Sequence, residues 1–286
     1  MHWKYDAAAV IVFPKGMPMQ PQYLILALVV GILIAEISTG RHRKVHRRQD
    51  FFMIGAVIAS TQVTRIAMAW LTATIIGLLI PAYKGALAGS PIIPSFLTLL
   101  FLAEFLQYWI HRTAHNPVRH PILHGMHRTH HSAPYVNVTL MYRTNLVWPL
   151  VHSYTWIAAA GFYLGMIQAT TIFYVTIMAW NALTHSDWRW DDAIIAHVPG
   201  GRHMITALEW ILITPRIHHA HHGYGRDGTA YRNFCTMVSI YDRLFGTLHT
   251  PAQRPWRYGL PGGEHAWWRQ LLYPLVPLGI ARKRDH

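Results

Sequence analysis

The chain has 286 residues, of which 52% are hydrophobic and 13% charged. It contains 25 Lys and Arg against 12 Asp and Glu, together with 21 His, 12 Trp and one Cys. The share of charged residues is about half that of an ordinary soluble domain, which argues against a disordered chain and against a routine soluble enzyme. The single cysteine excludes an intramolecular disulfide framework. The formal net charge of +13 comes from basic residues beside apolar runs, which favours anionic lipid headgroups over nucleic acid as the partner.

Apolar runs in the first 110 residues predict three membrane passes. Residues 23–38 form a run long enough to cross a bilayer, residues 51–81 predict an interfacial lead-in and then a span from about Ile66, and residues 95–110 cross back. The segment before the first run lacks the pattern of a cleaved signal peptide, so we expect a retained anchor. The end of the first pass is expected to be cytoplasmic because five basic residues follow it. These are Arg41, Arg43, Lys44, Arg47 and Arg48.

The second half of the chain begins with an apolar stretch and then becomes polar. Residues 146–180 are apolar, with Gly161 and Gly165 near the middle, which predicts a helical hairpin that enters and leaves the membrane. The chain ends with the basic run 282–284, as expected on the cytoplasmic side. We therefore expect an all-α, multi-pass integral membrane protein. It would have about four or five membrane-embedded helices and a cytoplasmic, histidine-rich helical cap.

Histidines gather in four places, all on the expected cytoplasmic side. On a helix, positions i, i+3 and i+4 share a face with Cβ atoms about 5 to 6 Å apart, so each cluster can direct two or three imidazoles to one point. Thr214-Pro215 predicts a helix start and Gly223 its end, so the last cluster is expected on one short helix. The four places are His111 with His115, His127 with His130 and His131, His185 alone, and His218 with His219, His221 and His222.

About nine imidazoles are too many for one tetrahedral zinc ion, which takes four ligands. They suit two metal ions of higher coordination number. Imidazole binds Fe(II) and Zn(II) alike, so the spacing leaves the metal open; only a redox metal would use open positions to activate O2. The spacing also leaves open whether His120, His124 or His219 is a ligand, because His124 shares a helical face with His127 and His131.

The order of these clusters resembles the fatty acid hydroxylase and sterol desaturase superfamily. The pattern is H-x3-H, H-x2-HH, a single His after Asn-x3, and H-x2-HH, and it continues in Thr214-Pro215-x-x-His218, Tyr231-Arg-Asn-Phe and Tyr241-Asp-Arg-Leu-Phe-Gly-Thr. The resemblance covers roughly residues 95 to 250. It implies a helical membrane domain, a cytosolic cap and a non-haem di-iron centre that oxidises unactivated C–H bonds of lipids with O2. Carried over by position, the implied ligands are His111, His115, His127, His130, His131, His185, His218, His221 and His222.

Four further residues are expected to orient these ligands. Glu104 and Gln107 precede His111 by seven and four residues on one helical face, and Asn181 precedes His185 by four. Each is a candidate for holding an imidazole in one tautomer. Asp187 follows His185 where the family often has Asn, and is the fourth candidate. His124 and His219 remain less favoured ligands, since the resemblance selects the other nine.

These observations predict an O2-dependent hydroxylase of a lipid, either a fatty acyl chain or a sterol-like substrate. Its cofactor would be two Fe ions, with Zn as the alternative in purified protein, and its electrons would come from a separate ferredoxin-like carrier or reductase. A lipid desaturase uses the same site and is the first alternative. A membrane protein that handles Zn or Cu is the second, although transport would place ligands along a path within the bilayer. We expect anchor helices in residues 1–94, the hydroxylase-like domain in 95–250 and a cytoplasmic tail in 251–286.

Overall fold

The computed structural model describes residues 21–42 and 45–281. The expectations for residues 1–20, for the basic residues Arg43 and Lys44 and for the terminal run 282–286 lie outside the described residues. The described part is mostly helical, as predicted. Its one two-stranded sheet pairs β1 (Gly223–Tyr224) with β2 (Arg257–Tyr258) in antiparallel register.

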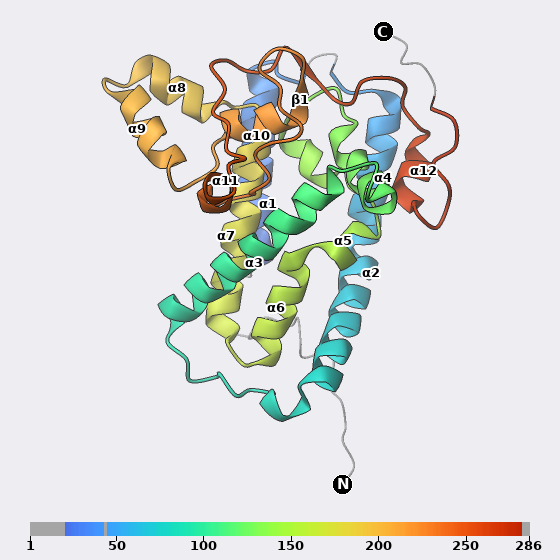
Figure 1. The fold of residues 1–286 in the computed structure, drawn as a ribbon, viewed down its shortest axis with the longest axis vertical. Helices are drawn as coiled ribbons and strands as arrows, with labels where there is room; N and C mark the ends of the chain where they lie inside the picture. The colour runs from blue at the N-terminus through green and yellow to red at the C-terminus, as the bar shows by residue number, and fades with distance from the viewer. Residues whose placement is uncertain (1–20, 43–44, 282–286) are drawn as a thin grey trace.

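Long helices form a bundle that makes up the lower part of the molecule in Figure 1. α3 packs against α6 and α7, α2 packs against α6, and α1 packs against α7. Buried apolar side chains such as Leu99, Phe173 and Ile177 fill the space between α3, α6 and α7. The bundle helices are α1 (Pro21–Ser38), α2 (Arg48–Leu79), α3 (Ile92–Ala114), α6 (Ser153–Tyr163) and α7 (Ile167–His185).

Two of the predicted membrane segments can be compared directly with the helices. The predicted lead-in and span, residues 51–81, lie up to residue 79 in one unbroken helix, α2, of 32 residues, which at 1.5 Å per residue is about 48 Å long. The predicted hairpin is present as α6 and α7, which reverse direction at Gly165, a glycine with φ of 91°. Gly161 allows the two helices to approach, because a Cβ there would lie 2.3 Å from Thr170 Oγ1.

Among the described helices, α3 is the one that is both long and apolar enough to cross a membrane. Shorter apolar helices cover Tyr23–Ser38 and Ala67–Leu79. The number of membrane passes and the side on which the cap lies therefore remain predictions.

Short helices cover one end of the bundle, where α4, α10 and α12 gather (Figure 1). Pro121 and Pro215 occupy the first turns of α4 and α10, where their missing N–H groups cost no helical hydrogen bond. The remaining elements are η2 (Pro81–Tyr83), α4 (Pro121–His131), η3 (Val138–Tyr142), α5 (Trp148–Val151), α8 (Trp190–His197), α9 (Gly201–Glu209), α10 (Pro215–His222), α11 (Ile240–Leu244) and α12 (Trp267–Leu272).

A buried ion network joins α2, the segment after α4 and the C-terminal segment. Arg143 is fully buried and forms ion pairs with Asp50 of α2 and Glu264 of the C-terminal segment. Its guanidinium also donates to Ser132 Oγ and to the Thr129 carbonyl at the end of α4. The first helices and the C-terminal segment are thus fixed onto the segment that carries the histidines.

Candidate metal centre

Nine histidine side chains from four helices lie in two compact groups. Within each group the ligand-capable atoms of all members lie within 4.8 Å of one another. The five-histidine group contains His111, His115, His127, His131 and His221, and the four-histidine group contains His130, His185, His218 and His222. The nine residues brought together are the nine that the resemblance implied as ligands.

Helix geometry explains why neighbouring histidines of α4 enter different groups. His127 and His131 are four residues apart and share a face of the helix, which is directed at the five-histidine group. His130 lies about 100° around the helix from His131 and enters the four-histidine group.

α10 repeats this arrangement with the groups exchanged. His218 and His222 enter the four-histidine group, and His221 enters the five-histidine group. The helix begins after Thr214 and ends at Gly223, as the sequence predicted. Thr214 does not cap it through its side chain, because its hydroxyl donates to Glu209 Oε1 at 2.8 Å.

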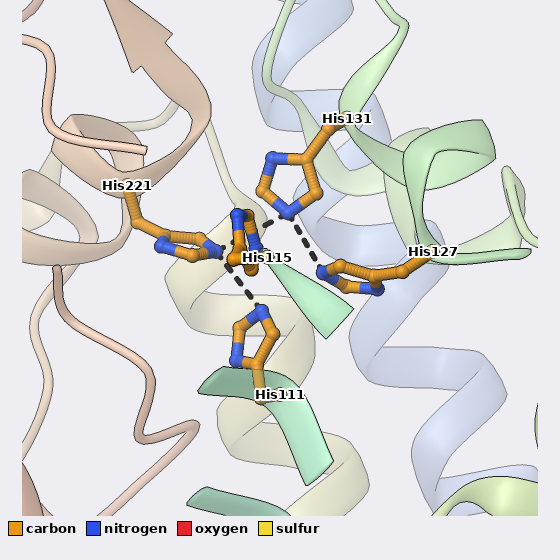
Figure 2. Close-up of side chains that lie close together, drawn as sticks. All are labelled: His111, His115, His127, His131 and His221. Carbon is orange, nitrogen blue, oxygen red and sulfur yellow. Dashed lines mark hydrogen bonds between the residues drawn. The ribbon is translucent and has the colours of Figure 1, made fainter. Parts of the chain in front are cut away.

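The five imidazoles of the first group turn toward a common centre (Figure 2). His221 Nε2 lies 3.0 Å from His111 Nε2 and 3.2 Å from His131 Nε2. His131 Nε2 lies 2.9 Å from His127 Nε2. These are spacings of neighbouring ligands on one ion whose metal–nitrogen bonds are about 2.1 Å long.

The second group has the same short separations. His185 Nε2 lies 3.0 Å from His130 Nε2 and 2.9 Å from His218 Nε2, and His218 Nε2 lies 3.1 Å from His222 Nε2. The two groups adjoin, because the rings of His131 and His222 stack with centroids 4.3 Å apart.

Backbone carbonyls determine which ring nitrogens carry a proton. In the five-histidine group, Nδ1 of His111 donates to the Phe234 carbonyl at 2.6 Å, and Nδ1 of His221 donates to the Arg232 carbonyl at 2.7 Å. A carbonyl only accepts, so a neutral ring bound in this way has its lone pair on Nε2. The two Nε2 atoms that face each other at 3.0 Å therefore both present lone pairs, which repel unless a cation lies between them.

The same arrangement occurs in the four-histidine group. Nδ1 of His130 faces the Arg143 carbonyl at 3.3 Å, and Nδ1 of His185 faces the Asn181 carbonyl at 2.8 Å. Their Nε2 atoms again point their lone pairs at one another. Each group thus contains a pair of acceptor nitrogens arranged for a positive ion.

Burial keeps the imidazoles of α4 and α10 neutral. The pKa values of His127, His131, His221 and His222 are well below the ordinary histidine value, mainly because burial disfavours the charged ring. Repulsion from a neighbouring imidazole lowers each of these pKa values further. Neutral imidazole is the form that binds a metal ion.

The donor set fits a transition metal. All nine atoms are imidazole nitrogens, which suit iron, zinc, copper or nickel and do not by themselves choose among them. His115 Nε2 is buried and has no hydrogen-bond partner among the described residues. A buried polar atom of this kind is costly unless something binds it, and a metal ion would do so.

Two C-terminal motifs hold the carbonyls that orient the five-histidine group. Asn233 adopts a left-handed φ of 59°, so the carbonyls of its neighbours Arg232 and Phe234 both face histidines. The Asn233 side chain donates to the Ile217 carbonyl at 3.1 Å and to the His249 carbonyl at 2.8 Å. The motif that begins at Tyr231 therefore serves His111 and His221 through its backbone.

Asp242 supports the same turn from the second motif. Its carboxylate accepts from the backbone N–H groups of Phe234 and Cys235 at 2.8 and 2.7 Å, and from the Thr247 hydroxyl at 2.7 Å. Sequence reasoning noticed both motifs only through the resemblance. Spacing patterns do not show where backbone carbonyls point. The one available signal was Asn233 itself, because Asn is a residue type that tolerates a left-handed backbone conformation.

Glu104 and Gln107 do not hold a histidine, contrary to the prediction. Glu104 is bonded to the Tyr154 hydroxyl and accepts from the backbone N–H groups of Met237 and Val238 at 3.1 Å. Gln107 Oε1 accepts from the backbone N–H and hydroxyl of Ser153, both at 3.1 Å. Both lie on the same side of α3 as His111, but in earlier turns of the helix. Their hydrogen bonds hold residues 153–154 and 237–238 against α3.

His185 Nδ1 donates to the main-chain carbonyl of Asn181 at 2.8 Å, a contact that any residue at this position would supply, so the role of the Asn181 side chain stays a prediction. Asp187 is not among the hydrogen-bond partners of His185: its carboxylate accepts from Arg189 Nε at 2.6 Å. The loop at Asp187 is instead held by Glu36 of α1, which accepts from the Asp187 backbone N–H at 2.6 Å.

The two less favoured histidines lie outside both groups. His124 Nδ1 bonds to the Ala114 carbonyl at 3.0 Å, and His219 Nδ1 lies 3.4 Å from the Tyr258 hydroxyl. His120 is the N-cap residue of α4. The spacing of the histidines gave no sign of Trp148, whose ring stacks on His127 with centroids 4.7 Å apart.

Comparison with known proteins agrees with this site. The model of the fatty acid hydroxylase family matches residues 96–247, which is more than half of the chain and includes all nine histidines. The chain belongs to the fatty acid hydroxylase family. No solved structure matches it.

Curated relatives match the same region. Over 166 residues the chain is 30% identical to alkylglycerol monooxygenase of Xenopus tropicalis, a match that covers 57% of this chain and 32% of the relative. The human alkylglycerol monooxygenase is 29% identical over 152 residues, covering 53% and 30%. A very-long-chain aldehyde decarbonylase of Oryza sativa subsp. indica is 25% identical over 184 residues, covering 61% and 26%. The matched part of the chain thus spans a third or less of each of these relatives.

Proposed function

We propose that this chain is a membrane-embedded, iron-dependent oxygenase that hydroxylates a C–H bond of a lipid. The observation that carries the proposal is the pairing of acceptor nitrogens: in each histidine group two Nε2 atoms with lone pairs face each other at 3.0 Å. Membership of the fatty acid hydroxylase family supports the reaction type. The names of the relatives support an oxidoreductase that acts on long-chain lipids.

All nine histidines would hold the metal, with one ion in each group. Two iron ions bound there would activate O2, so that one of its oxygen atoms enters the C–H bond and the other leaves as water, with two electrons from a separate donor and two protons. The protein itself holds the ligands in one tautomer through backbone carbonyls, keeps them neutral by burial, and excludes water.

The arrangement of the helices supports a membrane location for the bundle. α3 is the candidate span, and we propose that α1, α2 and the α6–α7 hairpin lie in the bilayer with it. Both histidine groups would then face the cytoplasm, because the basic residues Arg41, Arg47 and Arg48 lie where α1 has ended and α2 begins. The division into anchor, catalytic domain and tail stays part of this proposal.

The experiment compares lipid extracts of host membranes that express the chain, the His131→Ala variant or the His124→Ala variant. We expect a lipid that gains one oxygen with the chain and with His124→Ala, but not with His131→Ala, when the products are measured by mass spectrometry. His124 is the matched control because it lies on the same helix outside both groups.

Other products would redirect the proposal. A lipid that loses two hydrogens would identify a desaturase, which uses the same site. Unchanged lipids in the presence of a supplied reductant, together with bound Zn or Cu, would favour a metal-handling protein. Activity that survives in His131→Ala would remove the basis of the ligand assignment.

A further inference from the structure

A patch of exposed apolar side chains lies on α9, α11 and the residues that follow α9. Met204 lies on α9, and Trp210 and Ile211 directly follow its last residue, Glu209. Ile240 and Leu244 are four residues apart on α11 and share its outer side. The exposed fractions run from 46% to 68%. We call these five residues the α9–α11 surface.

The α9–α11 surface is continuous with the exposed face of α3. The Tyr241 hydroxyl donates to the Phe101 carbonyl of α3 at 2.8 Å, and the ring of Tyr241 lies against Phe105 with centroids 5.4 Å apart. One turn further along α3, Trp109 contacts Phe245 with centroids 4.9 Å apart. Lipid that covers the outer face of α3 therefore meets α11 next.

Arginines accompany the aromatic side chains of this region. The Arg243 guanidinium lies 3.8 Å from the centre of the Trp210 ring, and the Arg112 guanidinium lies 5.5 Å from that of Trp109. Arg202 is exposed on another side of α9. Tryptophan beside arginine, with apolar neighbours on one side and basic groups on the other, is typical of the boundary between acyl chains and anionic headgroups.

We propose that the α9–α11 surface is a second membrane contact, which lies in the headgroup and upper acyl region of the leaflet in which α3 ends. The proposal rests on α3 lying in a bilayer, as proposed above. A bilayer is favoured over a protein partner because α11 is in direct contact with α3. If α3 lies in lipid, the adjoining apolar side chains of α11 are expected to lie in lipid as well. The basic groups add attraction for anionic lipids.

This contact is coupled to the candidate metal centre. Residues 211–213, directly after α9, are tied to residues 237–239 by the bonds Ser239 N to Ile211 O at 2.9 Å and Ile213 N to Met237 O at 2.7 Å. Trp180 of α7 also donates to the Ile213 carbonyl at 2.9 Å. α10 begins two residues later and carries three of the nine histidines. The depth of the α9–α11 surface in the leaflet therefore sets the height of α10 above the acyl chains.

The test measures the depth of single fluorescent labels in the full chain, reconstituted in vesicles of phosphatidylcholine with one quarter phosphatidylglycerol. Labels are placed at Ile211→Cys and Leu244→Cys, with Thr206→Cys as the matched control on another exposed side of α9. Leu102→Cys reports the outer face of α3. The native Cys235 is 1% exposed, so the unsubstituted chain serves as the labelling blank. Lipids brominated on their acyl chains quench from within the bilayer, and iodide quenches from water.

We expect brominated lipid to quench the labels at positions 211 and 244 at least about threefold more than the label at 206, and iodide to do the reverse. Equal iodide quenching at 211, 244 and 206, with Leu102→Cys in lipid, would overturn this inference alone and leave the surface to a soluble partner. Iodide quenching at Leu102→Cys as well would overturn the membrane location of α3 and this inference with it.

Discussion

The two histidine groups receive similar contributions from α4 and α10 but differ in the further helix that supplies their remaining histidines: α3 for the five-histidine group and α7 for the four-histidine group. α4 and α10 each give two histidines to one group and one to the other, with the roles exchanged. The five-histidine group then receives His111 of α3 and His115, the C-cap residue of that helix, whereas the four-histidine group receives only His185 from α7. The difference indicates that an ion in the four-histidine group would have fewer protein ligands and more positions open to O2.

The groups also differ in what orients them. His111 and His221 of the five-histidine group depend on carbonyls of the turn at Asn233. His130 and His185 of the four-histidine group depend on the carbonyls of Arg143 and Asn181. Each group can therefore be disturbed separately, and the following variants use this difference.

The largest effect is expected from removing a ligand of the four-histidine group. His222→Ala leaves three imidazoles there, whereas His115→Ala leaves four in the other group. We expect His222→Ala to lower lipid turnover more than about 100-fold and to lower the metal content further than His115→Ala does. Elemental analysis and product mass spectrometry measure both quantities. Equal loss of metal in the two variants would show that the number of ligands does not distinguish the groups.

A smaller and selective effect is expected at Asn233. Asn233→Ala removes the side-chain bonds to Ile217 and His249 and places alanine at a left-handed φ, so the carbonyls of Arg232 and Phe234 should shift. We expect the affinity for metal in the five-histidine group to fall about 10- to 100-fold, measured by chelator competition. Asn233→Gly tolerates the backbone angle and should lose less. Unchanged affinity in both variants would contradict the role of the turn.

Arg143 is expected to act mainly on stability. Arg143→Met leaves the buried carboxylate of Asp50 without its ion-pair partner and leaves Glu264 paired only with Arg47, which costs about 3–5 kcal/mol in the free energy of unfolding. Denaturant unfolding in detergent measures the loss. Adding Asp50→Asn and Glu264→Gln to this variant should restore much of it, because no unpaired charge then stays buried. No recovery in the triple variant would show that the ion network is not the cause.

The smallest effect is expected at His124. Its ring bonds to the Ala114 carbonyl and belongs to neither group, so His124→Ala should cost about 1 kcal/mol or less in stability. Metal content and turnover should stay at the level of the unsubstituted chain. A loss of metal in this variant would reopen the choice between His124 and His127 that the spacing alone left undecided.

Sequence reasoning was most successful where local chemistry determines structure. Thr214-Pro215 and Gly223 predicted the limits of α10, and the spacing of four residues predicted which histidines of a helix enter one group. The expectation that a spacing of three does the same was wrong, because His127 and His130 enter different groups. Glycines predicted the α6–α7 reversal. Each of these features depends on residues close together in the chain.

Long-range contacts explain what the sequence did not predict. Glu104 lies one turn below Gln107 and two below His111, so its position suggested a role at the metal centre, yet its partners Met237 and Val238 lie more than 130 residues away. The carbonyl that orients His111 likewise comes from a turn 123 residues away, and the type of a residue does not show where its carbonyl points. The ligand roles of the nine histidines remain a prediction that metal analysis can test.

The most direct test of the account is the metal content of the purified full chain, expressed with added iron and measured by elemental analysis. We expect two ions per chain, with iron as the metal when iron is supplied. We expect the metal content to fall when His115 and His222 are both replaced. A chain that folds, as judged by its helical content, but binds no metal or only one ion would contradict the assignment of one ion to each histidine group.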